Sequence, residues 1–108
     1  MAFTHTRRRY ASLGTVAVLP GSIIDLFWYI IDTHLKDTIE LREVLNFEML
    51  DNHGKLAVKF SQSGNRLDDQ FEMVIDTGFP FEESWPRLFH AYDDLGRETI
   101  MTTNELDA

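Results

Sequence analysis

The residues best suited to metal chemistry in this chain are two histidines with acidic neighbours. His53 follows Asp51 in a turn-like segment, and His90 lies shortly before Asp93 and Asp94. An imidazole with a nearby carboxylate can ligate a metal ion, but zinc needs three or four converging ligands. No such pair is repeated here at metal-binding spacing. We therefore expect no metal ion and no other cofactor, with His53 and His90 as weak candidates.

Pairs of neighbouring acids are the other candidates for catalysis. General acid–base catalysis needs two carboxyl groups on facing elements with separated pKa values, whereas adjacent acids in one segment point apart. The chain also has no cysteine, no serine in a nucleophile-elbow motif and no glycine-rich phosphate loop. We therefore expect no enzymatic activity and no catalytic residue. The acidic pairs are Asp68-Asp69, Glu82-Glu83 and Asp93-Asp94.

Acidic charge is concentrated in the C-terminal part of the chain. The net charge is −8; residues 1–67 carry 8 basic and 7 acidic side chains, and residues 68–108 carry 2 basic and 11 acidic ones. Because phosphate contacts require Lys and Arg, we expect no direct nucleic-acid binding. A basic surface of another protein is the complementary partner. The residues expected to contact it are Asp68, Asp69, Glu72, Asp76, Glu82, Glu83, Asp93 and Asp94.

These properties predict a non-enzymatic acidic binding protein. A small acidic protein can imitate nucleic acid and occupy the basic surface of a nucleic-acid-handling protein. A Cas9-type nuclease, with its positively charged channel, is one target of this kind. The protein would then be an anti-CRISPR-like inhibitor from a phage or another mobile element. The competing interpretation is that the acids serve only solubility.

Three further alternatives remain open. The first is a homo-oligomeric structural or regulatory module that associates through a strand edge or through the aromatic side chains of Phe79, Phe81 and Trp85. The second is a metal-binding protein that uses His53 or His90 with nearby carboxylates. The third is nucleic-acid binding through basic residues, which the net charge disfavours. Those basic residues are Arg7, Arg8, Arg9, Lys55, Lys59 and Arg66.

A long helix over residues 22–37 is expected to organise the fold. Pro20 and Gly21 precede it, and Ser22 suits the N-cap. Apolar residues occupy most of the helix circumference, so we expect it to be largely enclosed. The helix is too short for a membrane span, which needs ~20 apolar residues. Its polar stripe consists of Asp25, Tyr29, Asp32 and Lys36.

Alternating apolar residues predict the strands around this helix. Residues 44–50 and 55–61 predict a hairpin, with a turn at 51–54. The helical spacing of apolar residues over 85–95 predicts a second helix that Gly96 ends. The other expected strands cover residues 10–19, 70–76 and 98–103. The fold class expected is therefore α+β: a small antiparallel sheet of three to five strands packed on one long helix, with a second short C-terminal helix.

The chain is expected to form a single domain over residues 1–108. Within it, we expect a loose tail at 1–6, a core at 9–76 and an acidic C-terminal helix and tail at 78–108. Three arginines near the N-terminus are followed by no long apolar segment. We therefore expect no secretory signal, and a cytoplasmic location.

Several short motifs follow one another at characteristic spacing between residues 9 and 76. They are Arg9-Tyr10, Gly14, Pro20, Leu26-Phe27-Trp28, Ile31-Asp32, Leu45-Asn46-Phe47-Glu48-Met49, Gly54-Lys55-Leu56 and Ser61-Gln62. With these motifs the chain resembles the domain of unknown function 960 family, small uncharacterised proteins of Gram-positive bacteria and their mobile elements. The resemblance implies an α+β fold. It implies no catalytic residue, because the family has no established chemistry.

Overall fold

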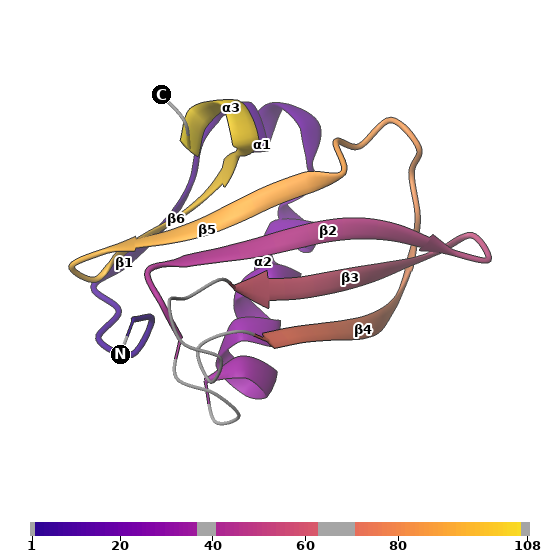
Figure 1. The fold of residues 1–108 in the computed structure, drawn as a ribbon. Coiled ribbons are helices and arrows are strands. Elements are labelled where there is room, and N and C mark those ends of the chain that lie inside the picture. Colours follow the sequence, from indigo (N-terminus) through magenta and orange to yellow (C-terminus); the bar gives the residue numbers. More distant parts are fainter. Residues whose placement is uncertain (1, 37–40, 63–70, 107–108) are drawn as a thin grey trace.

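A six-stranded mixed sheet forms the body of the protein. The computed structural model describes residues 2–36, 41–62 and 71–106. Strands lie in the order β1-β6-β5-β2-β3-β4 (Figure 1), and neighbours are antiparallel except β1 and β6, which are parallel. β1 and β4 are therefore the two edges. The strands are β1 (Arg8–Ala11), β2 (Val44–Asn52), β3 (Lys55–Gln62), β4 (Phe71–Pro80), β5 (Leu88–Asp94) and β6 (Arg97–Thr102).

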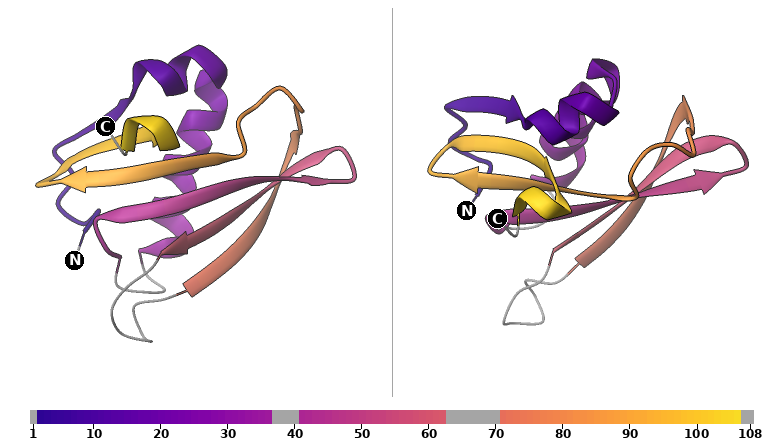
Figure 2. Two further views of the ribbon diagram at one scale, coloured as in Figure 1. Left: turned by 45° about the horizontal axis from the view of Figure 1, so that its top comes forward. Right: turned by 90° about the horizontal axis from the view of Figure 1, so that it is seen from above.

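Helices cover the two sides of the sheet unequally. α1 (Leu13–Val18) and α2 (Gly21–Ile30) lie on one side, the helix face, and α2 continues into a π-helical turn, η1 (Ile31–Leu35). The short α3 (Thr103–Leu106) lies on the opposite side, the open face (Figure 2). Much of the open face is consequently left uncovered by the helices of the described residues. None of these helices is long and apolar enough to cross a membrane.

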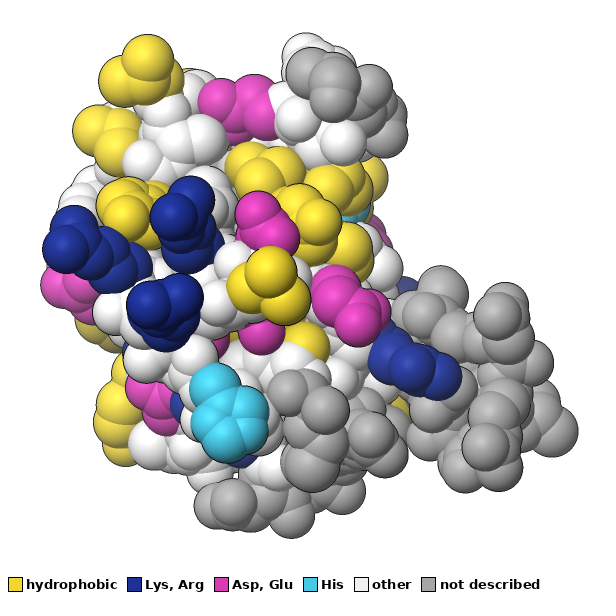
Figure 3. All heavy atoms as spheres, turned by 90° about the vertical axis from the view of Figure 1, so that its left-hand side faces the viewer, with side chains coloured by type: hydrophobic (Ala, Val, Ile, Leu, Met, Phe, Trp, Pro, Cys, Tyr) yellow, Lys and Arg dark blue, Asp and Glu magenta, His cyan; other side chains and the backbone are white. Residues whose placement is uncertain are grey.

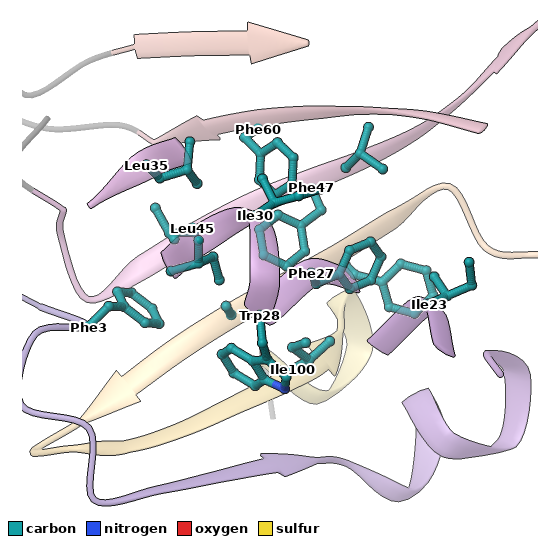
Figure 4. Packing of buried hydrophobic residues seen from close by; sticks show 14 of the residues in the cluster. Phe3, Ile23, Phe27, Trp28, Ile30, Leu35, Leu45, Phe47, Phe60 and Ile100 are labelled. Carbon is teal, nitrogen blue, oxygen red and sulfur yellow. The ribbon is translucent and has the colours of Figure 1, made fainter. Parts of the chain in front are cut away.

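Aromatic rings from the helix and the sheet form the centre of the core. The ring of Phe27 in α2 lies 4.9 Å from that of Phe47 in β2 and 6.3 Å from that of Phe89 in β5. Phe47 also contacts Phe60 in β3, with 4.8 Å between ring centroids. All four side chains are fully buried. Figure 4 shows those of Phe27, Phe47 and Phe60 between the helix and the sheet. This tilted and edge-to-face packing fixes α2 over the middle strands of the sheet.

The predicted β2–β3 hairpin is confirmed. Phe47 pairs with Phe60 and Met49 with Val58, so the buried residues of both strands share the helix face. His53 and Gly54 have φ of 54° and 84° in the connecting turn. Two successive residues with positive φ form the type of turn whose twist matches that of the strands in a two-residue hairpin loop. The alternation of apolar residues and the residues of the turn were sufficient to predict this hairpin, because its contacts are local in the sequence.

The expected small antiparallel sheet on one long helix, with a second C-terminal helix, is wrong. The structure is α+β, but its sheet has six strands and mixed pairing. The segment predicted as the second helix is largely strand β5. Its alternation buries Phe89 and Ala91 on the helix face, and pairing with β2 and β6 outweighs the helical spacing. Leu95 and Gly96, with φ of 52° and 93°, turn the β5–β6 hairpin rather than end a helix.

Two predictions at the N-terminus are also wrong. The strand expected over residues 10–19 ends at Ala11, because the Ser12 hydroxyl accepts a hydrogen bond from the Thr15 backbone N–H and caps α1. The segment expected as a loose tail contains Phe3, whose side chain is fully buried. Its backbone N–H donates to Asp93 Oδ2 at 2.8 Å. The start of the chain is thus fastened to β5.

Candidate functional site

The acids expected to form one partner-binding surface lie in separate places. Glu72 and Asp76 are on the open face of edge strand β4, and Glu82 and Glu83 are in the β4–β5 connection. Asp93 and Asp94 are at the far end of β5, beside the β5–β6 turn. Asp68 and Asp69 lie outside the described residues. No single contact surface can therefore include all of the described acids.

Several of these carboxylates bind neighbouring groups of the same chain. Glu72 lies 3.5 Å from Lys59 Nζ, and Asp76 Oδ1 accepts a hydrogen bond from Asn52 Nδ2 at 2.9 Å. Asp93 accepts from the backbone N–H groups of Phe3 and Gly96, both at 2.8 Å. Asp93 is therefore a structural residue that fixes the turn and the N-terminus.

Glu82 and Glu83 lie just after the C-terminal end of β4, at the start of the connection to β5. Both side chains are exposed, and neither forms an ion pair or a side-chain hydrogen bond with another described residue. The backbone N–H of Phe81 donates to the Gly54 carbonyl at 3.0 Å, which holds this connection beside the β2–β3 turn. Asp51 caps that turn through the Gly54 N–H at 2.7 Å. This end of the sheet is therefore rich in carboxylates.

An apolar hollow of about 220 Å³, here termed the Trp85 hollow, adjoins Glu82. The ring of Trp85 meets that of Phe81 edge to face, with 6.2 Å between their centroids. Among the described residues that line the hollow, Glu82 alone is charged. The hollow can thus accept an apolar side chain whose neighbours are basic. Its lining residues are Pro20, Ser22, Ile23, Phe79, Pro80, Glu82 and Trp85.

The two histidines named as weak metal candidates lie in unrelated positions. His53 is in the exposed β2–β3 turn. His90 is largely buried in β5, where Nδ1 lies 2.8 Å from Asn46 Oδ1 and Nε2 lies 3.0 Å from Thr103 Oγ1. Within the described parts of the chain, no three His, Asp or Glu side chains are grouped so as to hold a metal ion. His90 instead joins β2, β5 and the start of α3.

An ion cluster on the helix face fastens β1 to the rest of the fold. Arg9 Nε donates to Glu98 Oε1 at 3.0 Å, and its two terminal nitrogens donate to the Asp32 carboxylate at 2.6 and 2.7 Å. The guanidinium also lies 4.7 Å from the centroid of the Trp28 ring. These hydrogen bonds from Arg9, with a further ion pair to Lys36, lower the pKa of Asp32 to about 2. Glu98 is fully buried.

A second carboxylate links the two ends of the chain. Glu105 in α3 accepts hydrogen bonds from the Ser12 hydroxyl at 2.5 Å, the Thr102 N–H at 2.9 Å and the Gly14 N–H at 3.2 Å. The Ser12 bond and the Thr102 bond are the main causes that lower the pKa of Glu105 to about 2. A Cβ atom on Gly14 would lie 2.9 Å from Glu105 Oε1. The close approach of the Glu105 carboxylate therefore explains why a glycine is needed at this position.

Sequence reasoning identified neither the Arg9 nor the Glu105 cluster, because their partners are far apart in the chain. Arg9 and Glu98 are 89 residues apart, and Ser12 and Glu105 are 93 residues apart. Arg9 itself was the one indication in the sequence. In a strand its side chain lies on the face opposite to the side chains of Arg8 and Tyr10. A lone arginine on the core side of a strand predicts a carboxylate partner.

Comparison with known proteins confirms the family resemblance. A family model described as "Staphylococcal protein of unknown function (DUF960)" matches residues 8–105. The structure is similar to one titled "Crystal structure of the protein of unknown function from Enterococcus faecalis", with 44% sequence identity and a TM-score of 0.84 over 92% of this chain and 90% of that one. A search of curated proteins gave no match. Since the family model matches all six strands and reaches into α3, this chain belongs to the DUF960 family of Staphylococcal proteins of unknown function.

Proposed function

We propose that this protein is a non-enzymatic binding protein that receives a basic segment of another protein at the Trp85 hollow. The supporting observation is the position of Glu82 on the lining of an otherwise uncharged, mostly apolar hollow. Glu83 is adjacent in sequence and exposed. An apolar anchor with Lys or Arg on either side would fill the hollow and place its charges near both carboxylates.

The size of the site indicates the strength of binding. Burial of one large apolar side chain stabilises a complex by ~1.5–3 kcal/mol. Exposed charge pairs contribute ~0.2–1 kcal/mol each, and their main effect is on the association rate. One anchor and two carboxylates therefore support a weak complex unless further surface is buried. The acids of β4, Glu72 and Asp76, could extend the contact along the sheet edge.

The partner class that fits this site is a nucleic-acid-handling protein. Such proteins expose Lys and Arg for phosphate contacts. A Cas9-type nuclease, with its positively charged channel, belongs to this class. We propose the class on charge complementarity alone, and the inhibitory role follows only if the contact covers the partner's nucleic-acid site.

The test is a titration with a defined probe. A fluorescein-labelled peptide with a central Leu flanked by Lys and Arg is added to the wild type, to E82Q/E83Q and to W85A, and anisotropy is recorded at 50 and 300 mM salt. E43Q/D94N is the matched control, because it removes two exposed acids at the other end of the sheet. Capture from host lysate with the same four proteins then identifies the natural partner.

We expect binding to the wild type and the control to weaken with salt, and both hollow variants to bind at least about tenfold more weakly. An equal loss of binding in E82Q/E83Q and E43Q/D94N would show a general charge effect and contradict the proposal, and so would binding by E82Q/E83Q that equals that of the wild type. Salt-insensitive binding would contradict its electrostatic part.

Self-association through β4 is a second candidate function. β4 has ten residues and pairs only with β3 among the described strands, so its outer edge is open to another strand. A mass measured by light scattering that rises with concentration would support a dimer. Val74 is exposed at the middle of this edge, and V74P would then abolish the rise.

A further inference from the structure

A row of side chains crosses the open face at the end of the sheet opposite the Trp85 hollow. The strand register pairs Tyr10 of β1 with Thr99 of β6, Thr99 with Tyr92 of β5, and Tyr92 with Val44 of β2. Tyr10 is 44% exposed and Tyr92 is 38% exposed. Their strands are two spacings apart, ~9.6 Å, so each ring can contact a different planar group. Two exposed tyrosines therefore share one surface, although they are 82 positions apart in the sequence.

The neighbouring row on the same face contains two arginines, Arg8 and Arg97, followed by Asp94 of β5. Arg8 of β1 is paired with Arg97 of β6, two residues before Tyr10 and Thr99 respectively. Arg7 directly precedes Arg8 at the start of β1, where its backbone N–H donates to the Gly96 carbonyl at 2.8 Å. All three arginines are exposed. Within the described ranges none of their side chains forms an ion pair or a hydrogen bond, in contrast to Arg9. We term the two tyrosines and three arginines the Tyr–Arg platform.

Figure 3 shows this end of the molecule, where Lys and Arg side chains gather next to hydrophobic ones. Carboxylates also border the platform. Glu43 and Asp94 line a hollow of about 480 Å³ there. Asp94 of β5 pairs directly with Arg97 of β6, so among the arginines Arg8 of β1, on the other side of Arg97, is one strand farther from this carboxylate.

The acidity of the whole chain does not determine the field at this platform. β1 and β4 are opposite edges of a six-stranded sheet, so five strand spacings of ~4.8 Å put them ~24 Å apart. The Debye length is about 8 Å at physiological salt. Charges on Glu72, Asp76, Glu82 and Glu83 are therefore mostly screened at Arg8. The net charge of −8, which disfavours nucleic-acid binding, averages over two separate surfaces.

We infer that the Tyr–Arg platform binds single-stranded nucleic acid. Bases stack on the exposed rings of Tyr10 and Tyr92, while phosphates contact the arginines. An open sheet face with aromatic side chains in register is suited to unpaired bases, because a duplex hides the faces of its bases within the stack. The carboxylates of Glu43 and Asp94 can accept hydrogen bonds from base amino groups. This inference does not depend on the function proposed for the Trp85 hollow.

The test uses a 12-nucleotide single strand of mixed sequence, prepared as DNA and as RNA and labelled with fluorescein. Anisotropy is recorded at several salt concentrations for the wild type, Y10A/Y92A, Y10F/Y92F and R8Q/R97Q. The matched control is K55Q/R87Q, which removes two exposed cations away from the platform. The melting temperature of each variant is measured first, since all of these side chains are exposed and folding should be preserved.

We expect Y10A/Y92A to bind at least about tenfold more weakly, and Y10F/Y92F to bind like the wild type, because phenylalanine retains the stacking face. Three phosphate contacts predict a salt slope of about −2 for the wild type, and R8Q/R97Q should make that slope shallower by about 1.4. E82Q/E83Q should bind like the wild type, which separates this test from that of the proposed function.

Either of two results with the single strands, or one with a duplex, would overturn the inference. One is the absence of saturable binding to either strand at 50 mM salt. The other is an equal loss of binding in K55Q/R87Q and R8Q/R97Q, which would indicate non-specific attraction. Tighter binding of the same sequence as a duplex would also contradict it, because the tyrosines would then have no exposed base faces to contact.

Discussion

The two ends of the sheet differ in charge, in chemistry and in how their charged groups are used. At the β4 end, carboxylates surround an apolar hollow that contains Trp85. At the β1–β6 end, arginines flank two exposed tyrosines. The net charge of −8 therefore describes neither surface. Two adjacent arginines also differ. Arg9 forms ion pairs with Asp32 and Glu98, whereas the side chain of Arg8 is exposed to solvent.

The largest expected effect tests this difference between adjacent arginines. R9Q removes the cation beside Glu98, which is fully buried, and leaves that carboxylate without its ion pair. Removing one partner of a buried pair costs ~3–5 kcal/mol of the free energy of unfolding. Urea denaturation followed by circular dichroism measures it. R8Q is the control and should change the free energy by less than ~0.5 kcal/mol. Equal effects in both variants would refute the distinction.

The next effect concerns the contact between Gly14 and Glu105 beside the β1–β6 end. G14A places a Cβ atom 2.9 Å from Glu105 Oε1 and should displace the carboxylate from Ser12 and Gly14. Loss of these hydrogen bonds to a charged group should cost ~1.5–3 kcal/mol. In an E105A background the same substitution should be neutral or stabilising, because Ala favours a helix by ~1 kcal/mol over Gly. A G14A cost that is unchanged in E105A would contradict this explanation.

A smaller effect should appear in the dependence of stability on pH. Arg9 and Lys36 lower the pKa of Asp32 from its ordinary value of 3.8 to about 2. Because the folded pKa is below the unfolded one, this stabilisation is present above pH 4 and is lost as the pH falls toward 2. Asp32 is partly exposed, so its contribution should be ~1 kcal/mol at most. D32N should therefore show a shallower loss of unfolding free energy between pH 4 and 2.5 than the wild type, with D25N, which removes another exposed acid of α2, as the control.

The smallest effects on stability should come from the two proposed binding surfaces. E82Q/E83Q and Y10F/Y92F change exposed side chains and should shift the free energy of unfolding by less than ~0.5 kcal/mol. Their melting curves should therefore overlay that of the wild type. A large loss in either variant would mean that the surface is structural, and the comparison of the two ends would lose its functional meaning.

Local patterns predicted the hairpin and part of the helix but not the rest of the fold. The β2–β3 hairpin needs only alternation and a turn that Gly54 permits. β5 was missed because Leu88, Phe89, Tyr92 and Leu95 also fit a helical spacing. Pairing of β5 with both β2 and β6 decides between the two, and no local pattern contains that information.

For the two candidate sites, the sequence allowed the kinds of residue to be predicted but not how these residues come together in space. Glu82, Glu83 and Trp85 are close in sequence, so an acidic and aromatic segment could be recognised. Their contact with Pro20 and Ile23 depends on where α2 begins beneath the β4–β5 connection. Tyr92 was assigned to a helix, and the register that brings it level with Tyr10 requires a parallel β1–β6 pair.

The parallel pairing of β1 with β6 has a consequence for synthesis of the chain on the ribosome. Of the six strands described, β1 is made before the other five and its neighbour β6 after them, and Arg9 meets Glu98 across 89 residues. Closing a loop of that length is slow compared with forming a local hairpin. β1 therefore cannot pair with its neighbour until residues 97–102 have emerged. A polypeptide that ends before residue 97 would keep its N-terminal arginines but have no strand on which to fix them.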